Sequence, residues 1–443
     1  MNKERTNIYA QGSIPEFEND GDPFDKYYLP GRALCYLVKD PQDLIVLPDH
    51  PGMRGYNRDL TDIVREIGLR PMNPPIFIPD NAYLLDEAIR ANPELVEKRL
   101  KFGEDYRVKP YASTPQLEEW VGSLRLRGFN IEIGIPPRVY YDNLSHPAHR
   151  GGWGRHINNP DNPSFPEIWD LPYPVSFVGQ GLEQTLEAYE RVTQGSSDNR
   201  AFFKPVFSAG GSTLKGVTNK REVAEHYARL KAEGALNILG KETPIEIQGF
   251  IPDIEKAFCI HYDGPQIVTP GIVSWQVMDG TKWAGNRFNY GEDLRITGRV
   301  EGAMRRFFEG MIAYTEGNFH GEGGVDIAET SNPRQRLMII EHNGQRVNGG
   351  HPAIALASGL GVEDCYITQK APGEGPNCDL KTLWDELKGL GLTFNPSTRQ
   401  GVFPMIWMQG SGILWAAGDG IEDTQRKLDQ AFNVLTRRSY VRV

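Results

Sequence analysis

Cysteine is scarce in this chain. The 443 residues contain 4 cysteines, at Cys35, Cys259, Cys365 and Cys378, and no two of them form a C-x-x-C pair. Disulfide frameworks and cysteine-ligated zinc sites depend on closely spaced cysteines, so this spacing argues against both. Nothing beside any of the four favours a nucleophilic role. We therefore expect free thiols in a reducing, cytoplasmic compartment.

Three further features are absent. No block of basic residues stands out in a chain with net charge −10, which argues against an extended nucleic-acid surface. No uninterrupted apolar run is long enough to cross a bilayer, and the N-terminal MNKERTNIYAQGS lacks the apolar core of a signal peptide. Internal repeats and low-complexity tracts are also missing. The expected partners are small molecules, without nucleic acid or membrane.

The Walker A order G-x-x-x-x-G-K-[ST] is absent too, although FFKPVFSAGGSTLKGV (202–217) has the composition of a phosphate loop. Lys204 ends a strand-like segment and is placed to neutralise an α-phosphate. The turn that follows can present backbone N–H groups to the β- and γ-phosphates, and Lys215 adds a point charge. The turn residues assigned to this role are Gly210, Gly211, Ser212 and Thr213. An ordinary hairpin turn with solvated lysines remains the alternative.

The first part of the chain alternates strand and helix patterns. Short apolar segments at 33–38, 43–49, 76–80 and 130–135 predict buried strands, whereas residues 1–30 predict an irregular lead-in. A helix is predicted from Pro115 onward, because Thr114 suits the N-cap and Gly128 stops it. This alternation indicates an open α/β sheet.

Length and composition suggest about three domains. We place an N-terminal mixed α/β domain at 1–170, a second domain with the glycine-rich loop at 171–255 and a third at 256–443. Residues 136–174, rich in Gly, Pro and Asn, predict a long loop of the functional kind. Further helices are predicted at 181–195, 221–234, 300–317, 382–391 and 422–438, and strands at 244–251, 256–264 and 266–277.

The most informative segment is GGVDIAETSNPRQRLMIIEHNGQRVNGG, residues 323–350. Its central Ser-Asn-Pro turn predicts a β-hairpin, in which Glu341 and Asn343 share one face and Asp326 approaches from the partner strand. Two carboxylates and an amide oxygen suit Mg²⁺. Arg346 follows, where it can reach a phosphate or a developing oxyanion. Solvent-facing strand residues are the alternative for the carboxylates.

A third segment, QGFIPDIEKAFCI (248–260), predicts a strand, a tight turn and a second strand. The backbone at Gln248, Phe250 and Ile251 can hydrogen-bond an adenine edge, and Glu255 can accept from ribose hydroxyls. An ordinary connection between strands is the alternative. Arg287 can pair with a substrate carboxylate, but a structural role explains it equally well.

The order of these elements resembles the ATP-grasp superfamily. The resemblance covers about Pro172 to Pro352 and rests on the lysine strand with its small-residue loop, the hinge, and the Asp…Glu-x-Asn hairpin. Two positions depart from the family pattern: Arg346 is spaced one residue further out, and Gln248 stands where glutamate is common. Within the superfamily, the chain length and the GGWGRH loop (151–156) resemble peptide ligases of the pheganomycin type.

The resemblance implies an ATP-grasp fold with an N-terminal mixed α/β domain and a reaction that uses ATP with Mg²⁺, or Mn²⁺ in its place. A carboxylate of an amino-acid-like substrate would be activated as an acyl phosphate and joined to an amine. Catalysis would fall to Arg346, Lys215 and Arg287, nucleotide binding to Lys204, the glycine-rich turn and the hinge, and metal binding to Asp326, Glu341 and Asn343. Three alternatives stay open: transfer to a carrier-protein thiol, a nucleotide-binding regulatory protein, and a kinase. Amino acids or peptides, a carrier protein and a second copy of the chain are the candidate partners.

Overall fold

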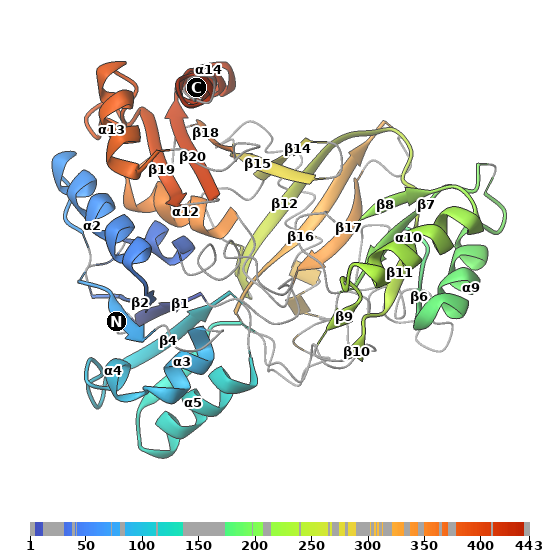
Figure 1. Cartoon of the computed structure of the whole chain (residues 1–443), viewed down its shortest axis with the longest axis horizontal. Helices are drawn as coiled ribbons and strands as arrows, with labels where there is room; N and C mark the ends of the chain where they lie inside the picture. Colours follow the sequence, from blue (N-terminus) through green and yellow to red (C-terminus); the bar gives the residue numbers. More distant parts are fainter. Residues whose placement is uncertain are drawn as a thin grey trace.

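The computed structural model describes most of the chain. The described residues are 5–11, 31–37, 40, 42–71, 73–79, 85–111, 114–135, 173–196, 198–206, 214–238, 241–264, 266–267, 274–279, 282–288, 302, 305–306, 308–309, 312, 321–331, 337–343, 350–362, 366–370, 378–408 and 411–437. Three large sheets organise them (Figure 1). A short pair, β9 (Asn237–Ile238) with β10 (Lys241–Glu242), accompanies them.

The first sheet has five strands in the order β3-β2-β1-β4-β5, and all its pairings are parallel. Its strands are β1 (Thr6–Ala10), β2 (Leu44–Asp49), β3 (Ile76–Pro79), β4 (Asp105–Pro110) and β5 (Asn130–Ile133). Its helices are α2 (Pro51–Glu66), α3 (Leu85–Ala91), α4 (Glu94–Glu97) and α5 (Pro115–Leu126). The predicted open α/β sheet is therefore confirmed in this part of the chain.

Helix α5 begins as the sequence predicts. The Thr114 hydroxyl accepts a hydrogen bond from the Leu117 N–H at 3.2 Å, and Pro115 occupies the first turn. This satisfies one of the N–H groups that a helix start leaves unpaired. Trp120, Leu124 and their apolar neighbours then pack with α3 against one face of the sheet.

Two predictions in this region were wrong. Residues 1–30 contain the central strand β1, because Ile8, Tyr9 and Ala10 are buried between β2 and β4. The segment from Ala33, expected to be a strand, forms the short 3-10 helix η2 (Ala33–Tyr36). Its residues are all buried. The apolar run therefore predicted burial correctly, but a run without polar residues does not distinguish a helix from a strand.

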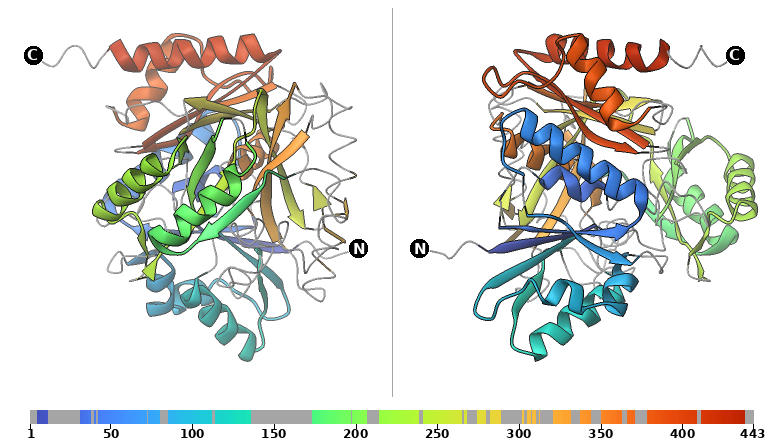
Figure 2. Two further views of the ribbon diagram at one scale, coloured as in Figure 1. Left: turned by 90° about the vertical axis from the view of Figure 1, so that its right-hand side faces the viewer. Right: turned by 60° about the vertical axis from the view of Figure 1, so that its left-hand side comes forward.

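The second sheet has four strands in the order β6-β11-β7-β8. They are β6 (Ser176–Gly179), β7 (Ala201–Pro205), β8 (Lys215–Val217) and β11 (Ile245–Gly249). Helices α9 (Gly181–Thr193) and α10 (Lys220–Ala232) cover one face, where Phe203, Ile245 and Ile247 form their common core. Figure 2 shows this unit as a separate lobe at one side of the molecule.

The third sheet has nine strands, in the order β17-β16-β12-β14-β15-β18-β20-β19, with β13 paired to β12. Its strands are β12 (Ile254–Gly264), β13 (Gln266–Ile267), β14 (Ser274–Asp279), β15 (Lys282–Phe288), β16 (Gly321–Thr330), β17 (Leu337–Asn343), β18 (Tyr366–Lys370), β19 (Gly401–Met408) and β20 (Ser411–Gly418). Helices α12 (Gly350–Gly359), α13 (Leu380–Gly389) and α14 (Ile421–Arg437) accompany it. The predicted hairpin of residues 323–350 is confirmed as the antiparallel pair β16–β17.

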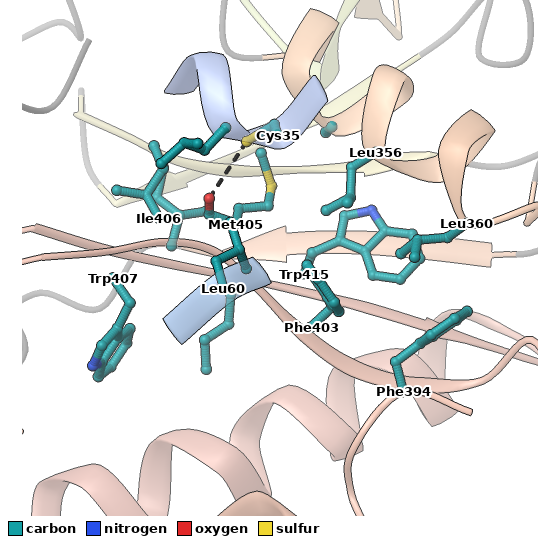
Figure 3. Packing of buried hydrophobic residues seen from close by; sticks show 14 of the residues in the cluster. Cys35, Leu60, Leu356, Leu360, Phe394, Phe403, Met405, Ile406, Trp407 and Trp415 are labelled. Atoms are coloured by element: carbon teal, nitrogen blue, oxygen red, sulfur yellow. Dashed lines mark hydrogen bonds between the residues drawn. The ribbon is translucent and has the colours of Figure 1, made fainter. Parts of the chain in front are cut away.

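One apolar core joins the first sheet to the end of the chain. Tyr9 and Leu47, on the face of the parallel sheet opposite α5, belong to the same cluster as Trp415 and Leu428. Figure 3 shows its centre, where the Cys35 thiol donates to the Met405 carbonyl at 3.4 Å. The described parts of 5–79 and of 380–431 therefore fold against each other rather than as separate layers.

The cysteines agree with the expected free thiols where they are described. Cys35, Cys259 and Cys378 form no disulfide bond, and Cys365 lies outside the described residues. Burial raises the pKa of Cys35 to about 12, so its thiol stays protonated at neutral pH. Among the described helices, none combines the length and apolar character that a bilayer crossing requires.

The predicted helices at 181–195, 221–234, 382–391 and 422–438 are confirmed as α9, α10, α13 and α14. Only scattered residues of 300–317 are described, and those are helical. The segment 136–174 lies outside the described residues except for its last two positions. Helices α2 and α12 were not predicted, because Pro and several Gly interrupt their sequences.

Candidate active site

The face of the four-stranded sheet opposite α9 and α10 carries polar side chains. Lys204 on β7 stands directly opposite Glu246 on β11, and both side chains are buried. Gln248, two residues further along β11, shares their face because strand side chains alternate. The intervening residues Phe203 and Ile247 point into the helix-covered core. A strand pair thus holds a buried lysine, a carboxylate and an amide on one side.

The β16–β17 hairpin supplies the second half of the site. Asp326 stands opposite Glu341, and Gly324 stands opposite Asn343, so the three predicted metal ligands share one face. The Asn343 amide donates to Asp326 Oδ2 at 3.1 Å. A β-bulge follows, since Ile327 pairs with Ile339 and leaves Ile340 as the extra residue. Bulges of this kind re-aim neighbouring side chains next to functional sites.

A single side chain connects the two halves. Gln248 Nε2 donates to the carbonyl oxygen of Ile340, the bulge residue, at 2.9 Å. Beside it, the Tyr173 hydroxyl donates to Glu246 Oε1 at 2.8 Å. Burial raises the pKa of Tyr173, and the carboxylates of Glu246 and Glu341 raise it further, so both acids lie near this hydroxyl. The polar face of β7–β11 therefore lies against the hairpin that carries the carboxylates.

The donor set fits a hard divalent cation. Asp326 and Glu341 offer carboxylate oxygens from directly opposed strand positions, and Asn343 keeps its amide oxygen because its nitrogen makes the bond to Asp326. In the described part of the chain, no three His, Cys, Asp or Glu side chains cluster around a common metal position.

Two predicted residues lie elsewhere. Lys215 stands opposite Phe203, on the helix-covered side of the small sheet, where it is exposed and acts on Glu222 of α10. Arg287 on β15 pairs with Trp275, which pairs with Phe258, which in turn pairs with Ile327 of β16. Since Ile327 is next to Asp326 on the strand, Arg287 lies on the opposite face of the sheet from Asp326. There Arg287 donates to Gln425 Oε1 of α14 at 3.0 Å. The structure therefore brings neither Lys215 nor Arg287 to the carboxylates of the β16–β17 hairpin.

The predicted hinge has the expected strand–turn–strand form, with Asp253 in the left-handed region (φ 55°) between β11 and β12. The Phe250 ring stacks on Phe202 at 5.5 Å, and the Arg200 guanidinium lies 3.9 Å from its centroid. Ile251 is buried against the hairpin, near Met338. Glu255 is exposed and is the extra residue of a β-bulge in β12.

Five predicted site residues lie outside the described residues: Gly210, Gly211, Ser212, Thr213 and Arg346. Conversely, Glu246 and Tyr173 belong to the site but were not predicted. The signal for Glu246 was available, since a carboxylate two residues before Gln248 must share its face on a strand. Tyr173 carried no comparable signal, because its contact depends on tertiary placement.

No family model and no curated protein matches the sequence. Solved structures do match over nearly the whole chain. A biotin carboxylase–β,γ-ATP complex from Campylobacter jejuni is 14% identical, with TM-score 0.56, covering 97% of this chain and 91% of that one. N5-carboxyaminoimidazole ribonucleotide synthetase from Thermus thermophilus is 13% identical, with TM-score 0.53 and coverage of 97% and 98%. The chain has the ATP-grasp fold.

A third ATP-grasp structure shows the same breadth of match. Phosphoribosylamine–glycine ligase from Thermotoga maritima is 12% identical, with TM-score 0.53, covering 98% of this chain and 96% of that one. At these identities the likeness establishes architecture, and the predicted α/β class and ATP-grasp fold are confirmed. Within this fold, the small sheet and the β16–β17 hairpin are the two surfaces that face each other.

Proposed function

We propose that this protein is an ATP-dependent ligase that joins a carboxylate to an amine. The observation that carries the proposal is the hydrogen bond from Gln248 to Ile340, because it brings the Lys204 face of the small sheet against the Asp326–Glu341 hairpin. A buried cation on one side and paired carboxylates on the other are the groups that a magnesium-bound triphosphate requires. The similar solved structures include ligases and a complex with β,γ-ATP, which supports the same conclusion.

Each residue has a defined task. Lys204 would neutralise phosphate oxygens, and its burial keeps that charge in a fixed place. Asp326, Glu341 and Asn343 would hold Mg²⁺, which when bound offsets the charge of the phosphates during transfer. Gln248 fixes the distance between the two groups, and Phe250 with Phe202 offers an aromatic surface beside the hinge. Arg346, three residues after Asn343, would contact a phosphate or the developing oxyanion, as its sequence position suggests.

The proposed reaction has two steps, formation of an acyl phosphate and its aminolysis. A carboxylate oxygen attacks the γ-phosphorus of ATP, the bond to the β-phosphate oxygen breaks, and ADP leaves. The amine nitrogen then attacks the acyl carbon, phosphate leaves with the electrons of the C–O bond, and one proton is released. Water must be kept from the acyl phosphate throughout. No protein nucleophile takes part.

The substrate class follows from the narrower sequence resemblance. The GGWGRH segment and the chain length resemble pheganomycin-type peptide ligases, so we propose an amino acid or short peptide as the carboxylate and an amino compound as the acceptor. A carrier-protein thiol as acceptor is the second candidate. Dependence of the reaction on a holo carrier protein would separate the two.

The test is a phosphate-release screen with Mg·ATP and pairs of amino acids and dipeptides. We expect ADP and phosphate with at least one pair, and an amide product of the corresponding mass. Glu341→Ala and Glu341→Gln should each lower the rate by about 100-fold or more, whereas Glu187→Gln, on the exposed face of α9, should not. Undiminished phosphate release by both Glu341 variants would refute the metal-site assignment.

Hydroxylamine distinguishes the ligase from a kinase. An acyl phosphate reacts with it to give a hydroxamate, whereas phosphate delivered to a hydroxyl gives none. Hydroxamate formation should depend on the carboxylate substrate and on ATP. Phosphorylated product without hydroxamate would point to the kinase.

A further inference from the structure

A second group of buried polar side chains lies at the carboxyl edge of the parallel sheet. Gln11 follows the last residue of β1 and is 0% exposed, yet neither its amide oxygen nor its nitrogen meets hydrogen-bond geometry. The Tyr36 hydroxyl of η2 and Glu322 Oε2 of β16 are equally buried without such a bond. Burial raises the pKa of Tyr36; Glu322 adds to the rise and Gln11 opposes it, so both lie near the hydroxyl.

The charge of Glu322 is already balanced. Lys109 Nζ donates to Glu322 Oε1 at 2.6 Å, and Arg107 pairs with the neighbouring Asp263 at 2.7 Å. Burial alone would raise the pKa of Glu322, but Lys109, with help from His351, lowers it to about 2. The carboxylate is therefore ionised at neutral pH. Its second oxygen remains available as an acceptor.

Buried polar groups in folded proteins are nearly always hydrogen-bonded, to protein or to a bound molecule. Here four such atoms make no hydrogen bond of good geometry to the described residues: two on Gln11, one on Tyr36 and one on Glu322. The Gln11 amide and the Tyr36 hydroxyl contact each other, outside that geometry. Gln11 follows β1, and β1 and β4 flank the point where the strand order of the parallel sheet reverses. Ligands of open α/β sheets bind outside the carboxyl ends of strands at this point.

This cluster also faces the proposed reaction centre. Glu322 and Asp326 lie on β16 four residues apart, and they share a face because side chains alternate. At ~3.3 Å per residue their Cα atoms are separated by about 13 Å. Gly324 is the one residue between them on that face, so no side chain interrupts the strand surface that joins them.

We propose that Gln11, Tyr36 and Glu322 bind the free α-amino group and first peptide carbonyl of the short peptide whose C-terminal carboxylate is activated at Asp326. This inference rests on the proposed ligase function and names its substrate more closely. Glu322 Oε2 and Gln11 Oε1 accept from the ammonium group, and Gln11 Nε2 or the Tyr36 hydroxyl donates to the carbonyl. An extended dipeptide spans about 7 Å, which leaves room for the transferred phosphate between its carboxylate and Asp326.

The kinetic test compares each active carboxylate with its N-acetylated form, which has lost the cationic amino group. For the wild type, we expect acetylation to raise KM at least tenfold. Gln11→Leu should raise KM for the free amine at least fivefold and KM for the acetylated form by a smaller factor, because acetylation removes the ammonium group but keeps the carbonyl. Tyr36→Phe, which loses only a donor to that carbonyl, should raise KM for both forms. Gln116→Leu serves as the matched control, since its amide oxygen on α5 is also buried without a bond and its amide nitrogen contacts Glu87 of α3 rather than Glu322. Equal use of free and acetylated substrates by the wild type would overturn the proposal.

Urea unfolding and KM, measured together for Gln11→Leu, distinguish a substrate-binding site from a cluster that holds only internal water. Gln11→Leu removes a buried amide that makes no hydrogen bond of good geometry, so it should raise the urea midpoint whether or not Gln11 binds substrate. If the midpoint rises and the KM ratio of free to acetylated substrate stays at the wild-type value, the cluster holds internal water only. That outcome contradicts the proposal.

A binding experiment without ATP distinguishes this failure from failure of the ligase function. Thermal unfolding is followed with a panel of free amino acids and dipeptides and with their N-acetylated forms. We expect at least one free amine to raise Tm for the wild type and for Gln116→Leu, but not for Gln11→Leu. A panel in which no compound, or only acetylated compounds, raises Tm would overturn the subsite even if phosphate release is observed.

Discussion

Tyr262 and His342 form a buried hydrogen bond between the Tyr262 hydroxyl and His342 Nε2, 2.7 Å long. His342 lies between Glu341 and Asn343 on β17, with its side chain on the opposite face of the strand. Tyr262 reaches it from β12 across β16, passing over Gly323. The bond therefore fixes the strand that carries two of the proposed metal ligands, from the side that faces away from the metal.

Gly323 makes this contact sterically feasible. A Cβ at this position would lie 2.2 Å from the Tyr262 hydroxyl, so Gly323→Ala must displace the ring or the strand. We expect a loss of roughly 1–3 kcal/mol of stability by urea unfolding and a reduced affinity for Mg²⁺ in the ATPase assay. Gly122→Ala on α5 has open space around its Cβ and should be neutral or slightly stabilising. An unchanged magnesium requirement in Gly323→Ala would show that the bond does not position the ligands.

Gln248→Glu should destabilise this chain. An ionised glutamate cannot donate to the Ile340 carbonyl, and it adds a charge beside Glu246. We expect a loss of roughly 1–3 kcal/mol in urea unfolding at pH 8. The loss should shrink as the pH falls and the carboxyl becomes protonated. A pH-independent loss would point to packing instead.

Lys204 and Arg287 provide a test of which sheet face carries the chemistry. Lys204→Gln should lower ATP turnover by about 100-fold, because it removes a buried charge beside the proposed phosphates. Arg287→Gln removes a group on the far face of the nine-stranded sheet, where Gln425 is its partner, so turnover should change less than about threefold while stability falls. A large loss of kcat in Arg287→Gln with normal stability would restore the catalytic role predicted from the sequence.

Asp86 makes stability depend on pH in an unusual direction. Burial raises the pKa of its carboxyl from 3.8 to about 7, although the Thr114 hydroxyl, 2.6 Å away, opposes the rise. Between these values the folded chain binds more protons than the unfolded chain, so this group's contribution to stability falls as the pH rises. Asp86→Asn should therefore gain roughly 1–3 kcal/mol relative to wild type between pH 4 and pH 8. The exposed Asp62→Asn should show no such trend.

The sequence predicted the parts of the site that depend on strand alternation and turn chemistry. The hairpin followed from the Ser-Asn-Pro turn, and the shared face of Asp326, Glu341 and Asn343 followed from the period of two. The roles suggested for Arg287 and Lys215 depended on which face of a sheet met which neighbour. Composition and spacing contain no information about that choice.

The same distinction applies to the fold. Helix α5 was predictable because its cap and stop are local signals. Strand β1 was not, because its burial at Ile8, Tyr9 and Ala10 comes from β2 and β4, whose paired residues lie 36 and 100 positions further along the chain. Helix η2 shows the opposite case, in which a buried apolar run was correctly located but its conformation was decided by packing.

The junctions between the sheets differ in stiffness. At one, the Glu322 N–H donates to the Gly134 carbonyl, and Gly321 has backbone atoms 2.4 Å from where a Cβ would lie, so the first sheet is fastened to β16 through its main chain. At the other, the described connection from β11 to β12 is a four-residue turn, and Gln248 supplies the hydrogen bond across the gap. We therefore expect the small lobe, formed by the described parts of residues 176–249, to move more readily relative to the nine-stranded sheet than the first sheet does. A crosslink between the first sheet and β16 should leave the proposed turnover unchanged. A crosslink between the small lobe and the β16–β17 hairpin should stop turnover, because it holds the lobe in one position.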